Sequence, residues 1–170
     1  MPDAGHLGTH PITLTDGTPT RTREVTPADL GPVQALHRRC SPISRALRYH
    51  AGKAELSSAG WRVLSDPKRG TTLVTTTAEC TDRIIAMTNV MRTDQQGVGE
   101  LAVLIEDEWQ SKGLGTALAA HAAHVARRAG HHTLTAAVAT VNAPMLHVLE
   151  ALDAPPVLAT GPVVDIHIPL

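Results

Sequence analysis

The sequence is poor in aromatic residues: among 170 residues there are two Trp, one Tyr and no Phe. The core must therefore be built from Leu, Val, Ile, Ala and Met, and few rings remain to stack on bases or sugars. The formal net charge is also close to zero, at −1. Nucleic-acid grooves and anionic membrane surfaces are bound through clustered basic residues, so we expect no nucleic acid and no membrane as a partner.

Cysteine and long apolar runs are scarce as well. Cys40 and Cys80 are too few for a disulfide framework, which predicts a reducing, cytoplasmic location. No uncharged apolar window reaches about 18 residues, so no transmembrane helix is predicted. The first ten residues lack the basic and apolar regions of a signal peptide. We expect residues 1–11 to be a mobile N-terminal segment and residues 12–170 to form a single domain.

Local signals along the chain predict an alternation of strands and helices. Asp16-Gly17 is a strong turn dipeptide and predicts a hairpin, whereas Thr26-Pro27 predicts a helix start with Thr as the N-cap. Strands are expected at residues 12–14, 18–25, 71–76, 83–91, 99–105, 132–140, 157–158 and 163–168. Helices are expected at residues 26–40, 41–49, 54–63, 114–129 and 142–152. This order predicts an α/β sandwich with a mixed sheet.

The most informative segment is the hexapeptide Gln110-Ser111-Lys112-Gly113-Leu114-Gly115, which follows a predicted strand and opens a predicted helix. Glycines at a helix start leave backbone amides unobstructed, and the first four N–H groups of a helix have no partner within it. Together with the helix macrodipole, these amides form a site suited to a phosphate or pyrophosphate. Lys112 adds a positive charge at the rim of this site.

Several known loops of this kind can be compared with the hexapeptide. The order G-x-x-x-x-G-K-[ST] of a P-loop is not present. A Rossmann fingerprint needs a third Gly or Ala where this chain has Leu118. The hexapeptide alone leaves two interpretations open. One is the Q-x-x-G-x-G pyrophosphate loop of the GNAT acetyltransferase superfamily, and the other is an ordinary helix start with Gly for flexibility.

The flanking sequence resembles a GNAT domain along nearly the whole chain, from about residue 14 to residue 170. The matching segments are Asp16-Gly17 with Arg23 and residues 25–29, Ser41-Pro42 with Arg48-Tyr49, residues 100–110, and residues 142–145. The last three are similar to the branch that includes the bacterial protein-lysine acetyltransferases. The resemblance implies a GNAT-type mixed central sheet flanked by helices on both faces, with acetyl-CoA as the acetyl donor.

In this family the pantetheine of acetyl-CoA lies in a V-shaped gap between two strands. The resemblance implies that the backbone of Val103, Leu104 and Ile105 pairs with the pantetheine amides, as an added strand pairs with a sheet edge. Asn142 would orient the cofactor; it is also expected to be a helix N-cap, and both roles can hold. The pyrophosphate would lie on Gln110, Ser111, Lys112, Gly113, Leu114, Gly115 and Thr116.

Glu100 is the candidate general base. An amine such as lysine, with a pKa of about 10.4, must lose a proton before it attacks the thioester. A positioned carboxylate can accept that proton directly or through a water. Strand alternation puts Glu100 on the same side as Ala102 and Leu104, so we expect it to be partly desolvated. The alternative is a solvated strand-end carboxylate; the spacing to Gln110, which is similar to the family pattern, favours the base.

The chain departs from the family at the general acid. Many members protonate the leaving thiolate with a Tyr on the last helix, and the matching position here is Leu149, seven residues after Asn142. The only tyrosine of the chain, Tyr49, falls in the substrate-side helices. A thiol with a pKa of about 8.5 is a tolerable leaving group, so this loss need not abolish turnover. His147 is a weaker candidate for a substitute acid.

No metal and no nucleophile are predicted. His121 and His124 have a helical spacing that metal sites use, but no Cys or carboxylate lies near them in the sequence. Cys40 is expected to end a helix, where packing is its usual role, and the family transfers the acetyl group directly.

The sequence therefore predicts an acetyl-CoA-dependent N-acetyltransferase that acts on a primary amine. The branch resemblance favours a protein lysine as the acceptor, and a small-molecule amine is the alternative. A non-catalytic acyl-CoA-binding regulatory domain is the rival from a different class, because the last-helix Tyr is missing. A homodimer is a further expectation.

Overall fold

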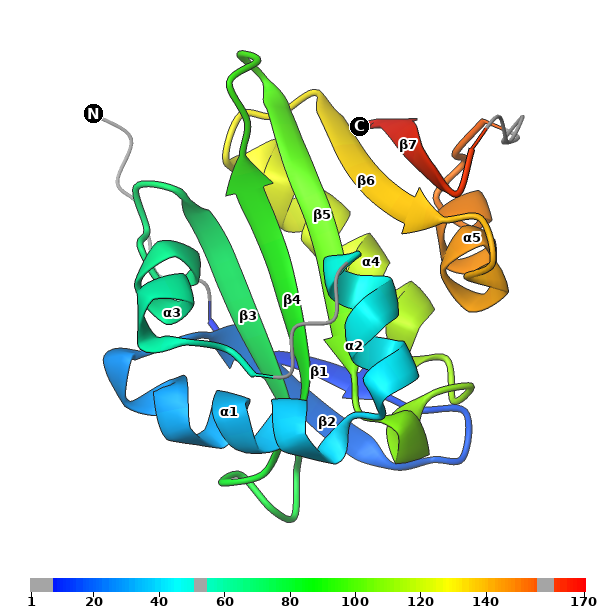
Figure 1. The fold of residues 1–170 in the computed structure, drawn as a ribbon. Coiled ribbons are helices and arrows are strands. Elements are labelled where there is room, and N and C mark those ends of the chain that lie inside the picture. The colour runs from blue at the N-terminus through cyan, green and yellow to red at the C-terminus, as the bar shows by residue number, and fades with distance from the viewer. Residues whose placement is uncertain (1–7, 51–54, 156–160) are drawn as a thin grey trace.

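The computed structural model describes residues 8–50, 55–155 and 161–170. Within these residues, seven strands form one sheet whose spatial order follows the sequence (Figure 1). The strands are β1 (His10–Thr13), β2 (Pro19–Glu24), β3 (Gly70–Thr77), β4 (Ile84–Arg92), β5 (Val98–Ile105), β6 (Thr133–Ala139) and β7 (Val163–Pro169). Neighbouring strands are antiparallel except for β5 and β6, which are parallel, so the sheet is mixed as predicted.

Helices cover both faces of this sheet, which confirms the predicted fold class. Figure 1 shows α1, α2 and α3 on one face and α4 and α5 on the other. No helix in the described part of the chain is long and apolar enough to cross a membrane. The helices are α1 (Leu30–Arg39), α2 (Pro42–Tyr49), α3 (Ser58–Leu64), α4 (Leu114–Arg128) and α5 (Ala143–Glu150), with short 3-10 turns η1 (Pro27–Asp29) and η2 (Asp107–Trp109).

The core is largely aliphatic. One cluster joins α4, α5, β6 and β7, and the buried face of α4 consists mostly of alanines that let the helix approach the sheet closely. A second cluster lies under α1 and α3 and contains Trp61, which is 4% exposed. A third joins the N-terminal hairpin to the start of α4 through Leu14 and Leu118.

Two boundaries differ from the predicted ones in an informative way, and one predicted strand cannot be compared. β1 begins at His10, so two residues of the segment expected to be mobile belong to the sheet. The third helix begins at Ser58 rather than at residue 54, because Ser57 caps it by accepting a hydrogen bond from the Gly60 N–H at 3.1 Å. The strand predicted at residues 157–158 lies outside the described residues.

The parallel pairing of β5 with β6 is short. It joins only Val98 to Thr133, Gly99 to Leu134 and Glu100 to Thr135. Beyond Glu100, β5 continues to Ile105 paired with β4 alone, while β6 continues paired with β7 alone. The sheet therefore splits between β5 and β6, and one edge of β5 from Leu101 to Ile105 has no neighbouring strand in the described structure.

Candidate active site

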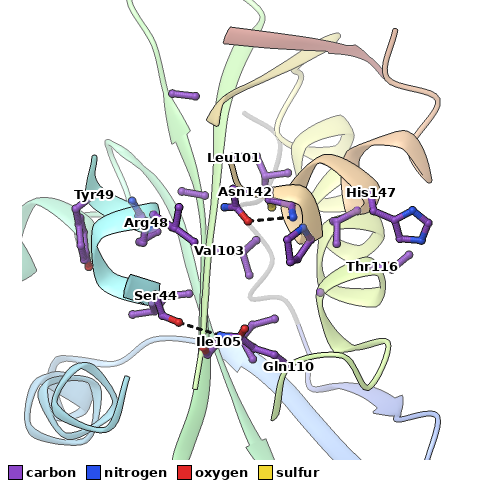
Figure 2. A pocket seen from close by; sticks show the side chains of 18 of the residues that line it. Ser44, Arg48, Tyr49, Leu101, Val103, Ile105, Gln110, Thr116, Asn142 and His147 are labelled. Carbon is purple, nitrogen blue, oxygen red and sulfur yellow. Dashed lines mark hydrogen bonds between the residues drawn. The ribbon is translucent and has the colours of Figure 1, made fainter. Parts of the chain in front are cut away.

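A cleft of about 650 Å³ opens where β5 and β6 separate, and it continues past β5 to α2 (Figure 2). We call its two parts the α4 side and the α2 side. The α4 side comprises the edge of β5 together with Gln110, Ser111, Gly113, Gly115, Thr116, Asn142, Pro144, Met145, His147, Val148 and Ala137. The α2 side comprises Ser44, Leu47, Arg48, Tyr49, His50 and Glu100.

The free edge of β5 forms the floor of the α4 side. Leu104 is 2% exposed and its side chain belongs to the core under α1, so this residue can offer only its backbone to the cleft. Val103 and Ile105 pack toward α4. An extended ligand with amide groups can add to such an edge as a strand would. The structure therefore brings Val103, Leu104 and Ile105 to the cleft, as expected from the sequence.

The loop after β5 turns sharply so that α4 starts beside this edge. Ser111 and Gly113 both adopt a left-handed conformation, with φ of 58° and 78°. A Cβ at Gly113 would lie 3.1 Å from Thr15 Cγ2, and one at Gly115 would lie 3.2 Å from Val148 Cγ2. Glycine at these positions keeps the first amides of α4 accessible, and the helix dipole makes this end electropositive. The geometry suits an anion such as a phosphate.

Two residues of the predicted loop site point elsewhere. Lys112 Nζ lies 3.3 Å from Asp16 Oδ2 and 4.8 Å from the centre of the Trp109 ring, so its charge is paired with the N-terminal hairpin. The side chain of Leu114 is 1% exposed and belongs to the core. Neither residue lines the cleft. Their backbone amides, but not their side chains, remain within the predicted site.

Gln110 joins the two sides of the cleft. Its Nε2 donates to the Ile105 carbonyl oxygen at 3.0 Å and to Ser44 Oγ at 3.1 Å. The first bond closes the loop onto the end of β5, and the second ties that loop to α2, as Figure 2 shows. The structure thus gives Gln110 a role in fixing the loop, in addition to its place in the cleft lining.

Asn142 and α5 close the opposite edge of the α4 side. Asn142 is the N-cap of α5: its Oδ1 accepts from the Met145 N–H at 3.2 Å while the residue also lines the cleft. Leu149, whose hydrocarbon side chain has no proton to donate, is 1% exposed and packs in the core with α4, β6 and β7. His147 is directed away from β5 in Figure 2, and its Nδ1 lies 3.6 Å from Glu150 Oε2.

Glu100 lies at the rim of the α2 side and is exposed to solvent. The expectation that it is partly desolvated is therefore wrong. Alternation placed its side chain on the correct face of the sheet, but the start of β5 extends beyond the cover of α2 (Figure 1). A carboxylate in this position is accessible to a water and to an amine that enters from outside.

Sequence reasoning did not assign a role to the face of α2 that lines the cleft. Ser44, Leu47 and Arg48 are three and four residues apart, so they lie on one face of the helix. Arg48 Nη2 donates to Asn89 Oδ1 of β4 at 2.7 Å. Burial lowers the pKa of Arg48, and Tyr49 and then the charge of Glu100 partly offset this, but arginine starts so high that it stays charged. Two signals in the sequence pointed to this face: the helical spacing, and the segment Ser41-Pro42 with Arg48-Tyr49 that resembles the family.

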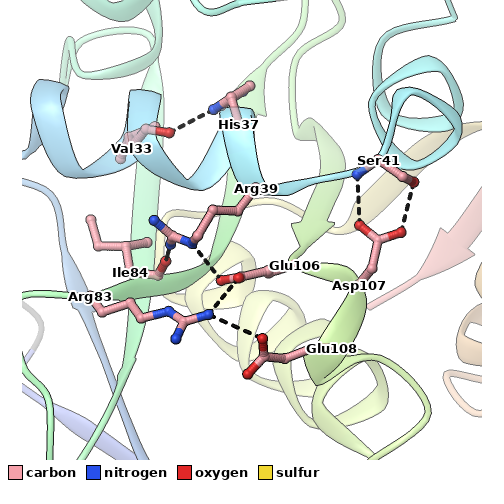
Figure 3. A network of polar contacts seen from close by, with 9 residues as sticks. All are labelled: Val33, His37, Arg39, Ser41, Arg83, Ile84, Glu106, Asp107 and Glu108. Atoms are coloured by element: carbon pink, nitrogen blue, oxygen red, sulfur yellow. Dashed lines mark hydrogen bonds and ion pairs between the residues drawn. The ribbon is translucent and has the colours of Figure 1, made fainter.

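A polar network fixes α2 to the segment that follows β5 (Figure 3). Asp107 accepts from the Ser41 N–H at 2.8 Å, from Ser41 Oγ at 2.7 Å and from Ser44 Oγ at 2.9 Å. Burial alone would raise the pKa of Asp107, but the hydrogen bonds from Ser41 and Ser44 hold it below its ordinary value. The start of α2 is thereby held on the same segment that leads into the Gln110 loop.

Glu106 also fixes the segment that follows β5, through two arginines. It is 4% exposed, and Arg83 Nη2 donates to its Oε1 at 2.6 Å. Arg39 Nε lies 3.0 Å from its Oε2 as an ion pair, without the alignment of a hydrogen bond. A buried carboxylate with two cationic partners resists displacement, because removal of either partner leaves charge poorly compensated.

Among the described residues, the remaining candidates from the sequence form neither a nucleophilic site nor a metal site. The thiol of Cys40 is buried, and burial raises its pKa to about 12, which makes it a poor nucleophile. His121 stacks on His10 with 3.9 Å between ring centres. Within the described ranges, no group of three or more His, Cys, Asp or Glu side chains is arranged to hold a metal ion.

Solved structures share this fold over nearly the whole chain. The GNAT domain of S. lividans PAT matches with a TM-score of 0.85 and 24% identity, covering 95% of this chain and 97% of that one. The yncA protein of Salmonella typhimurium, solved with its cofactor acetyl-CoA, has a TM-score of 0.68 and 16% identity, covering 89% and 94%. The Escherichia coli ribosomal-protein-S18-alanine N-acetyltransferase has a TM-score of 0.67 and 16% identity, covering 88% and 93%.

A family model gives the assignment at the level of sequence. No curated protein sequence matches this chain. Residues 33–153, however, match the model of the acetyltransferase (GNAT) family. That segment runs from α1 to the end of α5 and contains β5, the glycine loop and Asn142. The chain belongs to the acetyltransferase (GNAT) family.

Proposed function

We propose that this chain is an N-acetyltransferase that binds acetyl-CoA on the α4 side and transfers its acetyl group to a primary amine on the α2 side. The single observation that carries the proposal is the split between β5 and β6 with the glycine-rich start of α4 beside it. A free strand edge matches the amides of pantetheine, and the amides of a helix N-terminus match its pyrophosphate. The yncA protein, which shares the fold, was solved with acetyl-CoA, and this supports acetyl-CoA as the donor.

Glu100 is proposed as the general base. The amine arrives as an ammonium ion and must be deprotonated before it attacks the thioester carbonyl. Because Glu100 is exposed at the rim, a water between the carboxylate and the amine fits its position better than direct contact. Proton transfer of this kind contributes about 10²–10⁴-fold to the rate.

The leaving thiolate is proposed to depart without a tyrosine acid. Leu149 is buried, and the hydroxyl of Tyr49 is hydrogen bonded to His37 Nε2 on the far side of α2. A thiol with a pKa of about 8.5 leaves as a thiolate that solvent can protonate. This feature also favours the second candidate function, a domain that binds acyl-CoA without turnover.

The acceptor is proposed to be a protein lysine, with a small-molecule amine as the alternative. The proposal rests on the segments that resemble the protein-lysine branch and on the likeness to the GNAT domain of S. lividans PAT. Action in the cytoplasm and homodimer formation stay predictions from the sequence.

The test is release of CoA from acetyl-CoA in the presence of lysine peptides and polyamines. We expect acetyl-CoA to bind and at least one amine to raise CoA release well above the rate without acceptor. Tight acetyl-CoA binding with no acceptor-dependent release would favour the non-catalytic binding domain. Absence of acetyl-CoA binding would contradict both candidate functions.

A further inference from the structure

Arg48 is a cation that faces the cleft beside the proposed base. It lies in the second turn of α2, on the same helix face as Ser44 and Leu47, and all three line the cleft that Glu100 also lines. Figure 2 shows its side chain between α2 and β5, on the opposite side of β5 from Asn142. Arg48 and Glu100 therefore present opposite charges to the part of the cleft that an acceptor must enter.

Neutral groups hold the guanidinium in place. Arg48 Nη2 donates to Asn89 Oδ1 at 2.7 Å, and Asn89 Nδ2 donates to Thr72 Oγ1 at 2.9 Å. Thr72 Oγ1 in turn donates to the carbonyl oxygen of Leu64 at the end of α3. Asn89 is 1% exposed, so this chain of hydrogen bonds orients Arg48 from inside the sheet. The bond to Asn89 fixes one end of the guanidinium, and its Cζ lies 4.7 Å from the centre of the Tyr49 ring, so in the described part of the chain a neutral ring and no carboxylate completes its close contacts.

No carboxylate neutralises this cation at short range. Among the described residues, no Asp or Glu oxygen lies within 4.0 Å of Arg48, and its buried Nε has no hydrogen-bond partner. Two other partly buried arginines differ: Arg23 pairs with Asp29 at 2.8 Å, and Arg83 pairs with Glu106 at 2.6 Å. A partly buried charge without a counter-ion is costly unless a ligand supplies one.

We propose that Arg48 binds a carboxylate of the acceptor, so that the acceptor carries a carboxylate as well as the amine that is acetylated. The ammonium of such an acceptor is directed to Glu100 and its carboxylate to Arg48. Arginine suits this role because its planar N–H groups match the geometry of a carboxylate. The inference rests on the proposed function and narrows its acceptor. The carboxylate can belong to a free amino acid or to an acidic residue beside a lysine in a peptide.

Two matched pairs of acceptors test the proposal and distinguish these sources. One pair is free lysine and lysine amide; the other is a lysine peptide with Glu beside the lysine and the same peptide with Gln. The wild-type chain should prefer the carboxylate member of at least one pair by about 10–100-fold in kcat/KM, as expected for a charge-assisted hydrogen bond. A preference within the first pair identifies a free amino acid as the acceptor, and a preference within the second pair identifies an acidic residue beside a lysine in a peptide.

Variants assign the preference to Arg48. Arg48→Gln should abolish the preference while acetyl-CoA affinity stays within about twofold, and Arg48→Lys should retain part of it. Arg38→Gln is the matched control, since it removes the same charge from an exposed position on α1. If Arg48 only holds α2 to β4 and does not contact the acceptor, Arg48→Gln should lower activity equally on both members of each pair. This result would overturn the proposal.

Binding to the chain saturated with CoA, measured by calorimetry with the same four compounds, gives a readout that does not need turnover. A carboxylate preference in binding without any CoA release would support the Arg48 site and contradict the proposed function. Turnover with no carboxylate preference, in either pair, would support the function and overturn the Arg48 site. Melting curves of both Arg48 variants establish that they fold.

Discussion

The α4 side of the cleft is made mostly from backbone, and the α2 side is made mostly from side chains. On the α4 side, the edge of β5 and the amides at the start of α4 face the cleft in which the donor is proposed to bind, and two glycines keep the approach open. On the α2 side, Arg48 and Glu100 present charges, and hydrogen bonds that Asn89 of the sheet and Asp107 accept set the position of the helix.

The contrast accounts for how the proposed donor and the proposed acceptor would be selected. A backbone cradle needs glycine at fixed positions and tolerates many side chains around it, so it can bind one constant donor in many relatives. A side-chain wall changes with every substitution and can adapt to a new acceptor. Variants of the α4 side should therefore change donor binding, whereas variants of the α2 side should change acceptor use and spare donor binding.

The largest effect is expected for Gly113→Asp, which attacks the backbone cradle directly. The substitution puts a side chain at a φ of 78° and a negative charge where the pyrophosphate is proposed to bind. Like charges in contact cost several kcal/mol, so acetyl-CoA affinity should fall about 100- to 1000-fold in calorimetry. Gly130→Asp is the matched control, because Gly130 has a φ of 85° in open space beyond the other end of α4. Equal affinity in both variants would contradict the proposed loop site.

Glu100→Gln should separate chemistry from donor binding. We expect kcat to fall about 100-fold at neutral pH with acetyl-CoA affinity unchanged, and the deficit to shrink as rising pH deprotonates the amine in solution. Steady-state CoA release from pH 6 to 9, roughly the range in which such proteins stay folded, measures this. Asp94→Asn removes an exposed carboxylate from the β4–β5 loop and serves as the control. A wild-type rate in Glu100→Gln at every pH would exclude Glu100 as the base.

Asp107→Ala should loosen the α2 side while the α4 side stays intact. The variant loses the hydrogen bonds from Ser41 and Ser44 that hold the start of α2. We expect the acceptor KM to rise about fivefold, because a displaced wall misplaces the amine. The free energy of unfolding should fall by about 1 kcal/mol. Glu108→Ala, the adjacent carboxylate that contacts Arg83 instead of α2, is the control. If acetyl-CoA affinity falls by a larger factor than the acceptor KM rises, the separation of donor binding and acceptor binding between the two sides is contradicted.

The smallest expected effect is a pH dependence of stability that arises from His121 on the outer surface of α4. Burial, with smaller contributions from the charges of His10 and His124, lowers the pKa of His121 to about 4. An unfolded histidine titrates near about 6.5, so between these values the unfolded chain binds a proton that the folded chain does not. The free energy of unfolding should therefore fall as the pH falls through this range.

Chemical denaturation of His121→Gln between the two pKa values checks this expectation. The variant should show a shallower loss of stability with acid than the wild-type chain. His167→Gln, which changes an exposed histidine on β7, is the control. If the free energy of unfolding falls with pH equally in the wild-type chain and in His121→Gln, then protonation of His121 does not contribute to the loss of stability in acid.

The fold could be predicted from the sequence, and the residues proposed for the α4 side could be located in it, because both are specified by neighbouring residues. Caps such as Ser41, turn residues such as Gly17 and the alternation in β5 act within a few positions of the chain. Most residues of the proposed cofactor site are consecutive in the chain around the glycine loop, so the site can be recognised from the sequence. Even there, local geometry mattered: the left-handed Ser111 precedes Lys112, whose side chain pairs with Asp16 rather than lining the cleft.

The α2 side was harder to predict because its features depend on residues far apart in the chain. Arg48 is oriented by Asn89 and Thr72, which lie on β4 and β3, and no local pattern connects these three. The exposure of Glu100 depends on where α2 ends above the sheet, which strand alternation does not specify. Pairwise spacing along the chain therefore identified the side of the sheet on which Glu100 lies and not what covers it.

The three rungs of pairing between β5 and β6 also have a mechanical consequence. They leave the sheet as a five-stranded part and a two-stranded part that share few interstrand hydrogen bonds. A bound donor would connect these two parts, because it would hydrogen bond along the free edge of β5 and contact the start of α5. Hydrogen exchange of the backbone amides in β6 and β7 should then slow on acetyl-CoA binding far more than exchange in β2 and β3, because local opening is limited by the weakest seam of a structure.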